Sequence, residues 1–586
     1  MCGITGILTP GGLAPGAQPV LTRMTDALTH RGPDDSGSWM DMPAGIALGQ
    51  RRLSIIDLSP AGAQPMTSAS GRHVLVTNGE IYNYRALRRD LDEAGANVRW
   101  RGSSDTEVLL EAIAFWGLDE ALKRSHGMFA LALWDRRDRT LSLARDRMGE
   151  KPLHLAHMQG VWTFGSELKA LVHHPAWQGS INPDAIALCL RHGHIPAPLT
   201  LWHGVEKLLP GAIVEIDADG TRTDRQYWNL RQEARKARQH RFEGSLAEAT
   251  DRLDHLLREA VSRQMVADVP VGAFLSGGID SSAVVAAMQT VSATPVETFA
   301  LGFREEGRDE AGHARAIAAH LGTSHHEIYF TDEEARDLLV RMPEIYDEPF
   351  TDNSQLATCM IAAFARKRVT VSLSGDAGDE LFGGYNRYAK AQHLWGSGAR
   401  GWLSRKAEHA ALSLLDCGVM QPMQSLGLRH LLDRDISAAR QRMSRRRSLL
   451  GAVLPIAGYD AMFTAIYRAD LLVRGARLTP DPLLQEIAGE TGWSIVEQAS
   501  FLDMMRYLPD DILVKVDRAA MATSLETRIP LLDADVVRFA LSLPDRIRLC
   551  HGRPKGILRE VLSLHVPPLL WDRPKSGFGV PVDAWL

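Results

Sequence analysis

From about residue 250 onward, short strand-like runs alternate with longer helix-like stretches, and this alternation constrains the fold more than any other feature. The strand-like runs are VGAFL, VETFALGF, HHEIYF and VTVSLS. Strands that alternate with helices form a parallel sheet with right-handed crossovers, and such sheets bind ligands beyond the carboxyl ends of their strands. We therefore expect a site on the loops after Leu275, Phe303 and Leu373.

Residues 1–190 show a different pattern, in which short apolar runs are broken by Gly, Pro and Asn. This pattern predicts a sheet-rich unit with few helices. Ser104 and Glu107 form an S-x-x-E capping box ahead of an apolar run, which predicts a helix start. A polar, Arg-rich stretch at 222–244 is the expected linker. Because 586 residues are too many for one hydrophobic core, we expect two domains, at 1–215 and 235–586.

Charge and cysteine usage exclude several classes of protein. The chain has 66 basic and 71 acidic residues, a net charge of −5, which provides no general attraction to nucleic acid or membranes. The basic run Arg440 to Arg447 is interpreted as a solvated helix face. The five cysteines contain no CxxC pair, so we predict neither a disulfide framework nor a zinc site, and a reducing, cytoplasmic setting. No apolar run or N-terminal signal indicates membrane insertion or secretion.

Cys2 is the first candidate catalytic residue. If Met1 is removed, the thiol lies on the residue that also carries the terminal amine, and that amine can act as its general base. Asn78 and Gly79 follow a strand-like run and could supply an amide and a backbone N–H to an oxyanion hole. Glu80 offers a carboxylate for a substrate amine, and Arg52 could clamp a carboxylate. Asp105 could also bind an ammonium group.

A second site is predicted in the loop Ser276 to Ser282, SGGIDSS, which lies between a strand and a helix. Free backbone N–H groups and the helix dipole favour phosphate oxygens at such a position. The loop is neither a Walker A motif nor a GxGxxG motif, because both spacings are absent. Hydroxyls beside one carboxylate suit pyrophosphate with Mg²⁺. The loop Ser374 to Glu380, SGDAGDE, adds a second acidic cluster.

Five N-terminal motifs together resemble the glutaminase domain of class II, N-terminal-nucleophile amidotransferases. They are CGITG (2–6), HRGPDDSG (30–37), RLSIIDLSPAGAQPM (52–66), NGEIYNY (78–84) and GSSDTEV (102–108). The resemblance implies an αββα sandwich in which Cys2 is the nucleophile and Asn78 and Gly79 form the oxyanion hole. It also implies a set of residues that hold glutamine: Arg52, Leu53, Ser54, Ile55, Ile56, Asn78, Gly79, Glu80 and Asp105.

The remaining motifs resemble the pyrophosphatase-loop nucleotide-binding domain of asparagine synthetases. They are SGGIDSS, FALGF, SGDAGDELFGGY, LVKVDRAAMATSLETRIPLLD (513–533) and RPKSGFGVP (573–581). The fold class implied for the whole chain is α/β, an α+β sandwich followed by a parallel-sheet domain. The resemblance implies that ATP is bound by Leu275, Ser276, Gly277, Gly278, Asp280, Ser281, Ser282, Leu301, Ser374 and Gly375. It further implies that Asp280 and Asp379 hold Mg²⁺, that Lys575 stabilises the acyl-transfer step, and that Asp376 is an additional polar or basic group.

The reaction implied is glutamine hydrolysis at Cys2, transfer of ammonia through the protein, and amidation of an ATP-activated carboxylate. Aspartate is the expected acceptor, and the alternative is a specialised carboxylate chosen with help from residues 347–354, DEPFTDNS. A β-lactam-synthetase-like cyclase is a further hypothesis, which the intact Cys2 and NGE motif oppose, and a non-catalytic relative is the last. The sequence does not determine the oligomeric state, and a homodimer is one assembly that is compatible with it. Relatives usually continue past the position of Leu586, so we expect a shortened C-terminal domain or a truncated chain.

Overall fold

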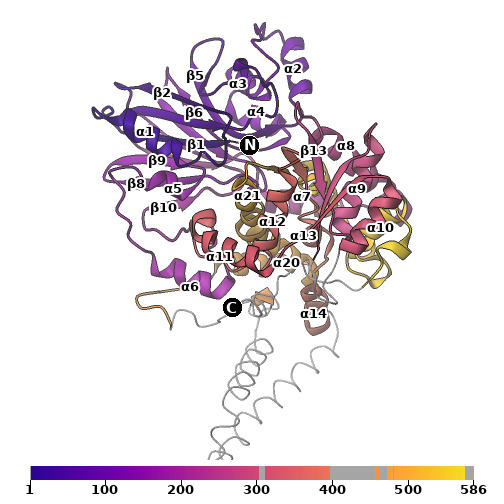
Figure 1. Ribbon diagram of the computed structural model, residues 1–586. Coiled ribbons are helices and arrows are strands. Elements are labelled where there is room, and N and C mark those ends of the chain that lie inside the picture. The colour runs from indigo at the N-terminus through magenta and orange to yellow at the C-terminus, as the bar shows by residue number, and fades with distance from the viewer. Residues whose placement is uncertain are drawn as a thin grey trace, which may run out of the picture.

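The computed structural model describes residues 2–302, 311–395, 456–457, 459–460, 472–478 and 481–573. The N-terminal residues, coloured indigo to purple in Figure 1, form a layered unit beside the helices and parallel sheet of the later residues. Two six-stranded sheets build this first unit, in the orders β10-β8-β9-β1-β3-β2 and β12-β11-β7-β6-β5-β4. Their strands are β1 Gly3–Leu8, β2 Asp35–Asp41, β3 Ile46–Arg52, β4 Met66–Thr67, β5 His73–Ile81, β6 Gly127–Asp135, β7 Thr140–Arg145, β8 His154–Met158, β9 Val161–Gly165, β10 Val205–Lys207, β11 Ala212–Ile216 and β12 Arg222–Gln226.

Alternating apolar side chains hold the two sheets face to face. Ile4 and Leu8 of β1 and Val74 and Val76 of β5 are completely or almost completely buried in one cluster between the sheets. Side chains two residues apart on a strand point to the same face, so this spacing gives each sheet one core-facing side. The outer faces carry helices α1 Ala17–Asp26, α2 Tyr84–Glu93, α3 Asp105–Trp116, α4 Leu118–Arg124 and α5 Leu168–Leu171, whereas α6 Pro183–His192 lies against the second domain (Figure 1), where the Cys189 thiol donates to the Pro349 carbonyl. The αββα architecture expected from the motifs is confirmed.

The predicted helix start at Ser104 is confirmed, but the predicted capping box is wrong. Ser104 accepts a hydrogen bond from the Thr106 N–H and caps α3. Glu107 does not bond back to the N-cap backbone, because its carboxylate accepts instead from the N–H groups of Arg101 and Gly102 and from the Arg101 guanidinium. The ion pair with Arg101 therefore replaces the reciprocal half of the motif.

The stretch 222–244 is more ordered than a linker. It contains β12, which pairs with β11 in the second sheet, and helix α7 Leu230–Gln239. Arg231 and Arg235 of α7 form ion pairs with Glu490. The N-terminal sheet therefore continues past residue 215, where we expected the first domain to end, and α7 packs on the second domain.

The second domain is built on a parallel five-stranded sheet in the order β15-β14-β13-β16-β17. Its strands are β13 Val271–Phe274, β14 Glu297–Gly302, β15 Ser324–Tyr329, β16 Val371–Leu373 and β17 Glu526–Arg528. The first four confirm the predicted strand runs, whereas β17 was not predicted. Because β14 and β16 lie on opposite sides of β13, the loops after β13 and β16 meet where the strand order reverses, which is the usual ligand position in such sheets.

Helices cover this sheet and fill most of the remaining described chain. They are α8 Leu246–Gln264, α9 Ile279–Val291, α10 Ala311–Leu321, α11 Asp332–Tyr346, α12 Gln355–Ala365, α13 Gly378–Phe382, α14 Asn386–Trp395, α19 Pro482–Ala488, α20 Ile495–Leu502, α21 Leu513–Met521, α22 Ala534–Ser542, α23 Asp545–Arg548 and α24 Gly556–Ser563, with a π-helix at Asp503–Ile512. The predicted helices α9, α10 and α11 are confirmed. The basic run Arg440 to Arg447, Lys575 and Leu586 lie outside the described residues.

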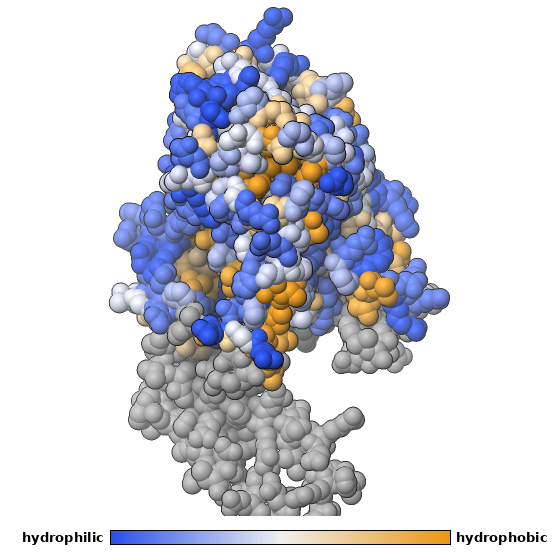
Figure 2. Space-filling view, turned by 90° about the vertical axis from the view of Figure 1, so that its left-hand side faces the viewer, coloured by the Kyte–Doolittle hydropathy of each residue, from blue (hydrophilic) through white to orange (hydrophobic). Residues whose placement is uncertain are grey.

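One face of the molecule is largely polar (Figure 2). On the face in Figure 2, hydrophilic side chains cover most of the coloured surface and hydrophobic ones gather in limited areas. Across the described ranges of the chain, no helix is both long enough and apolar enough to cross a bilayer.

Candidate functional site

The first site forms where β1 and β5, one from each sheet, come together. The Cys2 N–H donates to Asn78 Oδ1 at 2.9 Å, although the two residues lie 76 positions apart. Asn78 is fully buried, and its Nδ2 group has no hydrogen-bond partner within the described part of the chain. A buried amide donor without a partner is costly. The Asn78 side chain is therefore fixed by the Cys2 backbone and keeps its Nδ2 group available as a donor.

Gly79 supplies a second donor through the geometry of β5. The N–H and C=O of Phe129, opposite Gly79 on β6, both bond to Asp146, so Gly79 and Phe129 are a non-hydrogen-bonded pair. The Gly79 N–H therefore points away from β6. On this edge the N–H of Thr77 donates to Gln64 and that of Ile81 to Asp105. A Cβ at Gly79 would collide with the Met128 carbonyl oxygen, so only glycine fits.

Burial sets the charge state of the thiol and of the acidic residues near it. Burial raises the pKa of the Cys2 thiol, while the Leu53 N–H and the Arg52 guanidinium act in the opposite direction. Burial also raises the pKa of Glu80 well above its usual range, and the Asp105 carboxylate adds to this shift. Burial raises the pKa of Asp105 to about 6. A substrate ammonium group would favour the charged form of both carboxyls.

Glu80 is a buried acceptor that the protein leaves partly unused. Its Oε2 atom accepts no hydrogen bond within the described residues, and Arg528 Nη2 lies 3.9 Å away. Asp105 is held differently, because its Oδ2 accepts from the Ile81 N–H at 2.8 Å. One fixed and one unsatisfied carboxyl side by side form a suitable receptor for a substrate amine.

Arg52 ends β3 and is held by the turn that follows it. Its Nη1 donates to the Ser59 carbonyl at 3.2 Å, and its Nη2 donates to the Asp57 carbonyl. A guanidinium group has five N–H donors, so donors remain for a carboxylate. Residues 53–56, predicted to hold glutamine, follow Arg52 directly. Leu53, Ile55 and Ile56 are buried, and the Ser54 N–H donates to Asp34.

The second site contains the loop Ser276 to Ser282 at the start of α9. The Ser276 and Ser281 hydroxyls bond to each other at 3.0 Å, and the Ser276 hydroxyl accepts from the Gly278 N–H at 3.3 Å. Gly277 has φ +71° and packs against Ala314. The Ser282 hydroxyl is buried and has no partner in the described ranges. This closed turn at a helix N-terminus is suited to phosphate oxygens.

The loop after β16 packs directly on this turn. A Cβ at Gly375 would lie 2.5 Å from the Ser281 nitrogen, and one at Gly378 would collide with the Asp280 carboxylate. Ser374 donates to the Asp376 carboxylate in the same loop. Leu275 and Leu301 are buried at the ends of the neighbouring strands β13 and β14. The structure thus brings together the nucleotide-site residues predicted on β13, β14 and β16.

Lys555, which the sequence did not identify, joins the two acidic positions of this site. Its Nζ contacts the Asp280 carboxylate and lies 2.8 Å from Asp379 Oδ1. Burial alone would lower the pKa of Lys555, but the two carboxylates raise it. Two carboxylates that converge on one cation are a donor set that fits Mg²⁺. Lys555 lies in an ordinary G-R-P-K-G turn, and no local signal marks it.

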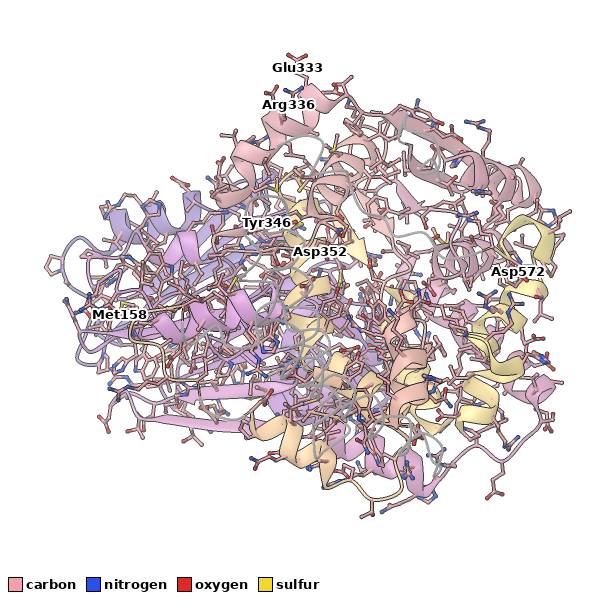
Figure 3. The ribbon with its side chains drawn as sticks, turned by 90° about the horizontal axis from the view of Figure 1, so that it is seen from below. Met158, Glu333, Arg336, Tyr346, Asp352 and Asp572 are labelled. Carbon is pink, nitrogen blue, oxygen red and sulfur yellow. The ribbon has the colours of Figure 1, made fainter. Side chains whose placement is uncertain are left out.

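A third polar cluster lies next to the nucleotide loops. Lys515 of α21 donates to Asp352 Oδ2 at 3.0 Å and to the Ser354 hydroxyl at 2.8 Å. Burial and the neighbouring Asp352 raise the pKa of Asp511 well above its usual range. The Asp376 carboxylate also acts on Lys515 and helps to raise its pKa. Figure 3 shows Asp352 and Tyr346 near the centre of the molecule, between the purple N-terminal elements and the orange helices.

The comparisons with known proteins agree with this arrangement. Residues 1–228 match the model of the glutamine amidotransferase domain family, and residues 252–586 match that of the asparagine synthase family. Asparagine synthetase (glutamine-hydrolysing) 1 of Bacillus subtilis is 32% identical over 590 residues, covering 100% of this chain and 88% of that protein. A putative asparagine synthetase (glutamine-hydrolysing) of Mycobacterium bovis is 34% identical, covering 100% of this chain and 88% of that protein. Amidase chry2 of Gibberella zeae is 26% identical, covering 100% and 90%.

Among solved structures, a glutamine PRPP amidotransferase from B. subtilis aligns at 15% identity with a TM-score of 0.29, over 56% of this chain and 81% of that one. This likeness is too distant to carry an argument. The matches to the two family models, over a sandwich and a parallel sheet, define a glutamine amidotransferase domain fused to an asparagine synthase domain. The chain belongs to the asparagine synthase family and is an ATP-dependent, glutamine-hydrolysing ligase.

Proposed function

We propose that this chain is a glutamine-dependent asparagine synthetase, which uses ATP and glutamine to convert aspartate into asparagine, with glutamate, AMP and pyrophosphate as the other products. The proposal has a glutaminase half, in which Cys2 acts, and a synthetase half, in which the loops after β13 and β16 act. We also propose that the domains divide after β12, between Gln226 and Leu246, rather than at residue 215.

In the glutaminase half, the Cys2 thiol attacks the carboxamide carbon of glutamine after removal of Met1. The Asn78 amide and the Gly79 N–H donate to the oxyanion of the tetrahedral intermediate. The terminal amine takes the thiol proton and returns it to the leaving ammonia, and water then hydrolyses the thioester to glutamate. The support is the buried Asn78 Nδ2 donor that has no protein partner in the described chain and lies on the residue bonded to Cys2.

Glutamine itself would be oriented by the groups around this donor pair. Arg52 and the backbone of residues 53–56 would hold its α-carboxylate, and Glu80 and Asp105 its ammonium group. The unsatisfied Glu80 Oε2 supports this orientation, because a buried carboxyl without a donor is completed by a substrate ammonium.

In the synthetase half, the Ser276 to Ser282 loop would hold the pyrophosphate part of ATP and the Ser374–Gly375 turn would hold the adenylate. Asp280 and Asp379 would bind Mg²⁺, which neutralises phosphate charge. The acceptor carboxylate displaces pyrophosphate, and ammonia from the first site then displaces AMP. An ammonia molecule delivered directly stays unprotonated, whereas free ammonia at neutral pH is mostly ammonium. Asp376 and Lys575 are proposed to assist this acyl transfer.

The observation that favours aspartate is the cluster around Lys515. A buried ammonium flanked by Asp352 and Asp511 presents both charges to a ligand within a small volume. A small zwitterionic amino acid has complementary charges, whereas a large apolar carboxylic acid would leave these groups unpaired.

The test is product identification by mass spectrometry after incubation with ATP, glutamine and each of several carboxylates. Asparagine formed from aspartate, with AMP and glutamate, supports the proposal. Amidation of a larger carboxylate, with aspartate ignored, would replace aspartate as the acceptor and keep the rest. Release of glutamate with no amide product from any acceptor would overturn the synthetase half.

A further inference from the structure

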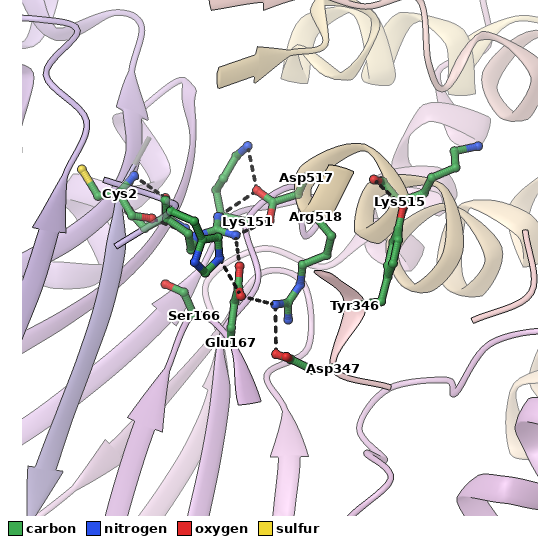
Figure 4. Close-up of polar contacts among 12 residues, drawn as sticks. Cys2, Lys151, Ser166, Glu167, Tyr346, Asp347, Lys515, Asp517 and Arg518 are labelled. Carbon is green, nitrogen blue, oxygen red and sulfur yellow. Dashed lines mark hydrogen bonds and ion pairs between the residues drawn. The ribbon is translucent and has the colours of Figure 1, made fainter. Parts of the chain in front are cut away.

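A buried ionic network connects the residue that carries the proposed nucleophile to the loop that faces the synthetase site. Arg31 donates from Nε to the Cys2 carbonyl at 3.1 Å and from Nη1 to Glu167 Oε1 at 2.7 Å. Glu167 Oε2 lies 3.0 Å from Arg518 Nη1, and the same nitrogen lies 3.3 Å from Asp347 Oδ2. Figure 4 shows this path as a line of contacts across the boundary between the two domains.

The network is attached firmly at its glutaminase end. Ser166, next to Glu167, accepts from the Ile4 N–H at 3.0 Å and donates its own N–H to the Ile4 carbonyl at 2.9 Å. Ile4 lies in β1, two positions after Cys2. Glu167 is therefore the direct neighbour of a residue, Ser166, that is bonded to the strand carrying Cys2. Arg31 and Glu167 have side-chain exposures of 0% and 1%, so neither can move without desolvated neighbours moving as well.

The opposite end of the network is the start of the 347–354 loop. Asp347 ends α11 with φ +62°, a backbone conformation that is strained for most residues and tolerated best by Gly, Asn and Asp. Lys169 holds Asp347 too, with its Nζ 3.3 Å from Oδ1. Five residues later in the same loop, Asp352 bonds to Lys515. A displacement of Asp347 would thus move the loop that pairs with Lys515.

Helix α21 carries residues that contact both ends of the ionic network. Lys515 points to Asp352 and Ser354, whereas Asp517 and Arg518, less than one turn later, face Arg31 and Glu167. Asp517 binds Arg31 through both oxygens, at 2.8 Å and 3.0 Å. A rigid helix whose residues face both sites transmits a shift from one site to the other without bending.

Stability alone does not account for such a network. Removing several charges from water costs free energy that their mutual attraction repays only in good geometry, and apolar replacements of buried ion pairs often leave stability unchanged. Each charge here has at least one partner of opposite sign, and burial, which would raise the pKa of Glu167, is overcome by Arg518, Lys169 and His30, which lower it. The arrangement therefore specifies one relative position of the two sites.

We propose that Glu167, Arg518 and Asp347 are positioning residues that make glutamine hydrolysis productive only when the 347–354 loop is in place. This inference rests on the proposed roles of Cys2 and of that loop. The network couples the two sites, so occupation of the synthetase site favours the arrangement of Cys2 that reacts, and glutamine in the first site favours the position of the 347–354 loop in which Asp352 bonds to Lys515.

The test variant is Glu167→Gln, which removes the charge in the middle of the network, outside the 347–354 loop, and keeps the size and shape of the side chain. We expect glutamine hydrolysis without ATP and ammonia-dependent synthesis to remain within about 2-fold of the unmodified enzyme. The ratio of asparagine formed to glutamate released should fall by roughly 2- to 30-fold, the range seen for residues that carry coupling between sites. Arg518→Lys, which keeps the charge, should retain most of the ratio.

The matched control is Asp533→Asn. Asp533 is a buried carboxylate that also joins the domains, through Arg263 at 3.0 Å and His126 of the first domain at 3.8 Å, but none of these contacts leads to Cys2. Asparagine keeps its N-cap role on α22. The control should leave the ratio unchanged.

An unchanged ratio in Glu167→Gln would overturn the inference, as would an equal fall in Asp533→Asn, because either result assigns the network to general stability. Failure of the proposed function is distinguishable. If the unmodified enzyme amidates another carboxylate instead of aspartate, the ratio is measured with that acceptor. If Cys2→Ala still hydrolyses glutamine, the nucleophile assignment fails, and the coupling inference fails with it.

Discussion

Lys555 Nζ lies 2.8 Å from Asp379 Oδ1 and also contacts Asp280, so one ammonium group joins the two acidic loops of the proposed nucleotide site. The contact spans 275 residues, from the turn before α24 to the first turn of α9. The lysine holds two carboxylates together that would otherwise repel each other in a largely buried site, and it places a positive charge where pyrophosphate would develop negative charge.

Lys555→Met should therefore reduce ATP-dependent chemistry by about 10²- to 10³-fold, the usual loss when one positioned charge-stabilising group is removed. The measurement is aspartate-dependent exchange of labelled pyrophosphate into ATP. Glutamine hydrolysis without ATP should be retained, because Lys555 lies outside the first site. Lys390→Met, at an exposed position on α14, is the control, and an equal loss in that variant would contradict the assignment.

Asn78→Ala tests the oxyanion hole. The Asn78 Nδ2 donor is buried and unpaired among the described residues, so its removal should lower kcat for glutamine hydrolysis by about 10²- to 10³-fold with a smaller effect on KM. Synthesis from ammonium salts should continue at nearly its normal rate. If both activities fell together, the residue would be structural, since Asn78 also accepts a hydrogen bond from Cys2.

The parts of the fold that depend on local sequence were predictable. Strands β13 to β16 coincide with the short strand-like runs that alternate with helix-like stretches in the sequence, and α9 to α11 lie in those stretches. The absence of a reciprocal capping-box bond at Ser104 was not predictable, because Arg101 competes for Glu107 through a contact that local patterning does not reveal.

The sites were predictable only where a motif marks them. Cys2, Asn78 and the Ser276 to Ser282 loop lie in recognisable motifs, although nothing local indicates that Cys2 and Asn78 meet. Lys555 and Glu167 have no distinctive neighbours, and their importance comes from partners at distant positions in the chain. Long-range ionic contacts therefore require the three-dimensional structure.

The pH dependence of glutamine use should follow Asp105. Burial raises its pKa to about 6, and its ionised form is the one that attracts the ammonium group of glutamine. As pH falls below about 6, Asp105 takes up a proton, so KM for glutamine should rise and kcat/KM should fall, approaching tenfold per pH unit. Above about pH 7 the carboxylate is ionised and this dependence should disappear.

The check is a profile of kcat/KM for glutamine from about pH 5 to pH 8, with Asp105→Asn as the matched variant. The variant should bind glutamine more weakly at about pH 7.5 and should lose the acid-side decline that belongs to Asp105. An identical decline in both enzymes would assign the pH dependence to another group, such as Glu80, whose pKa is also raised by burial.

Lys515→Met separates acceptor binding from nucleotide binding. The Lys515 ammonium donates to Asp352 and Ser354, and loss of one member of a buried, hydrogen-bonded charge pair typically costs about 2–5 kcal/mol in binding. We therefore expect KM for aspartate to rise by about 30-fold or more, with KM for ATP nearly unchanged. Asp352→Asn, which keeps the Ser354 contacts but removes a charge, should give a smaller rise. A lysine that only stiffened the loop would lower kcat for every acceptor equally, whereas a lysine that recognises the substrate should discriminate between aspartate and acceptors that lack its second charge.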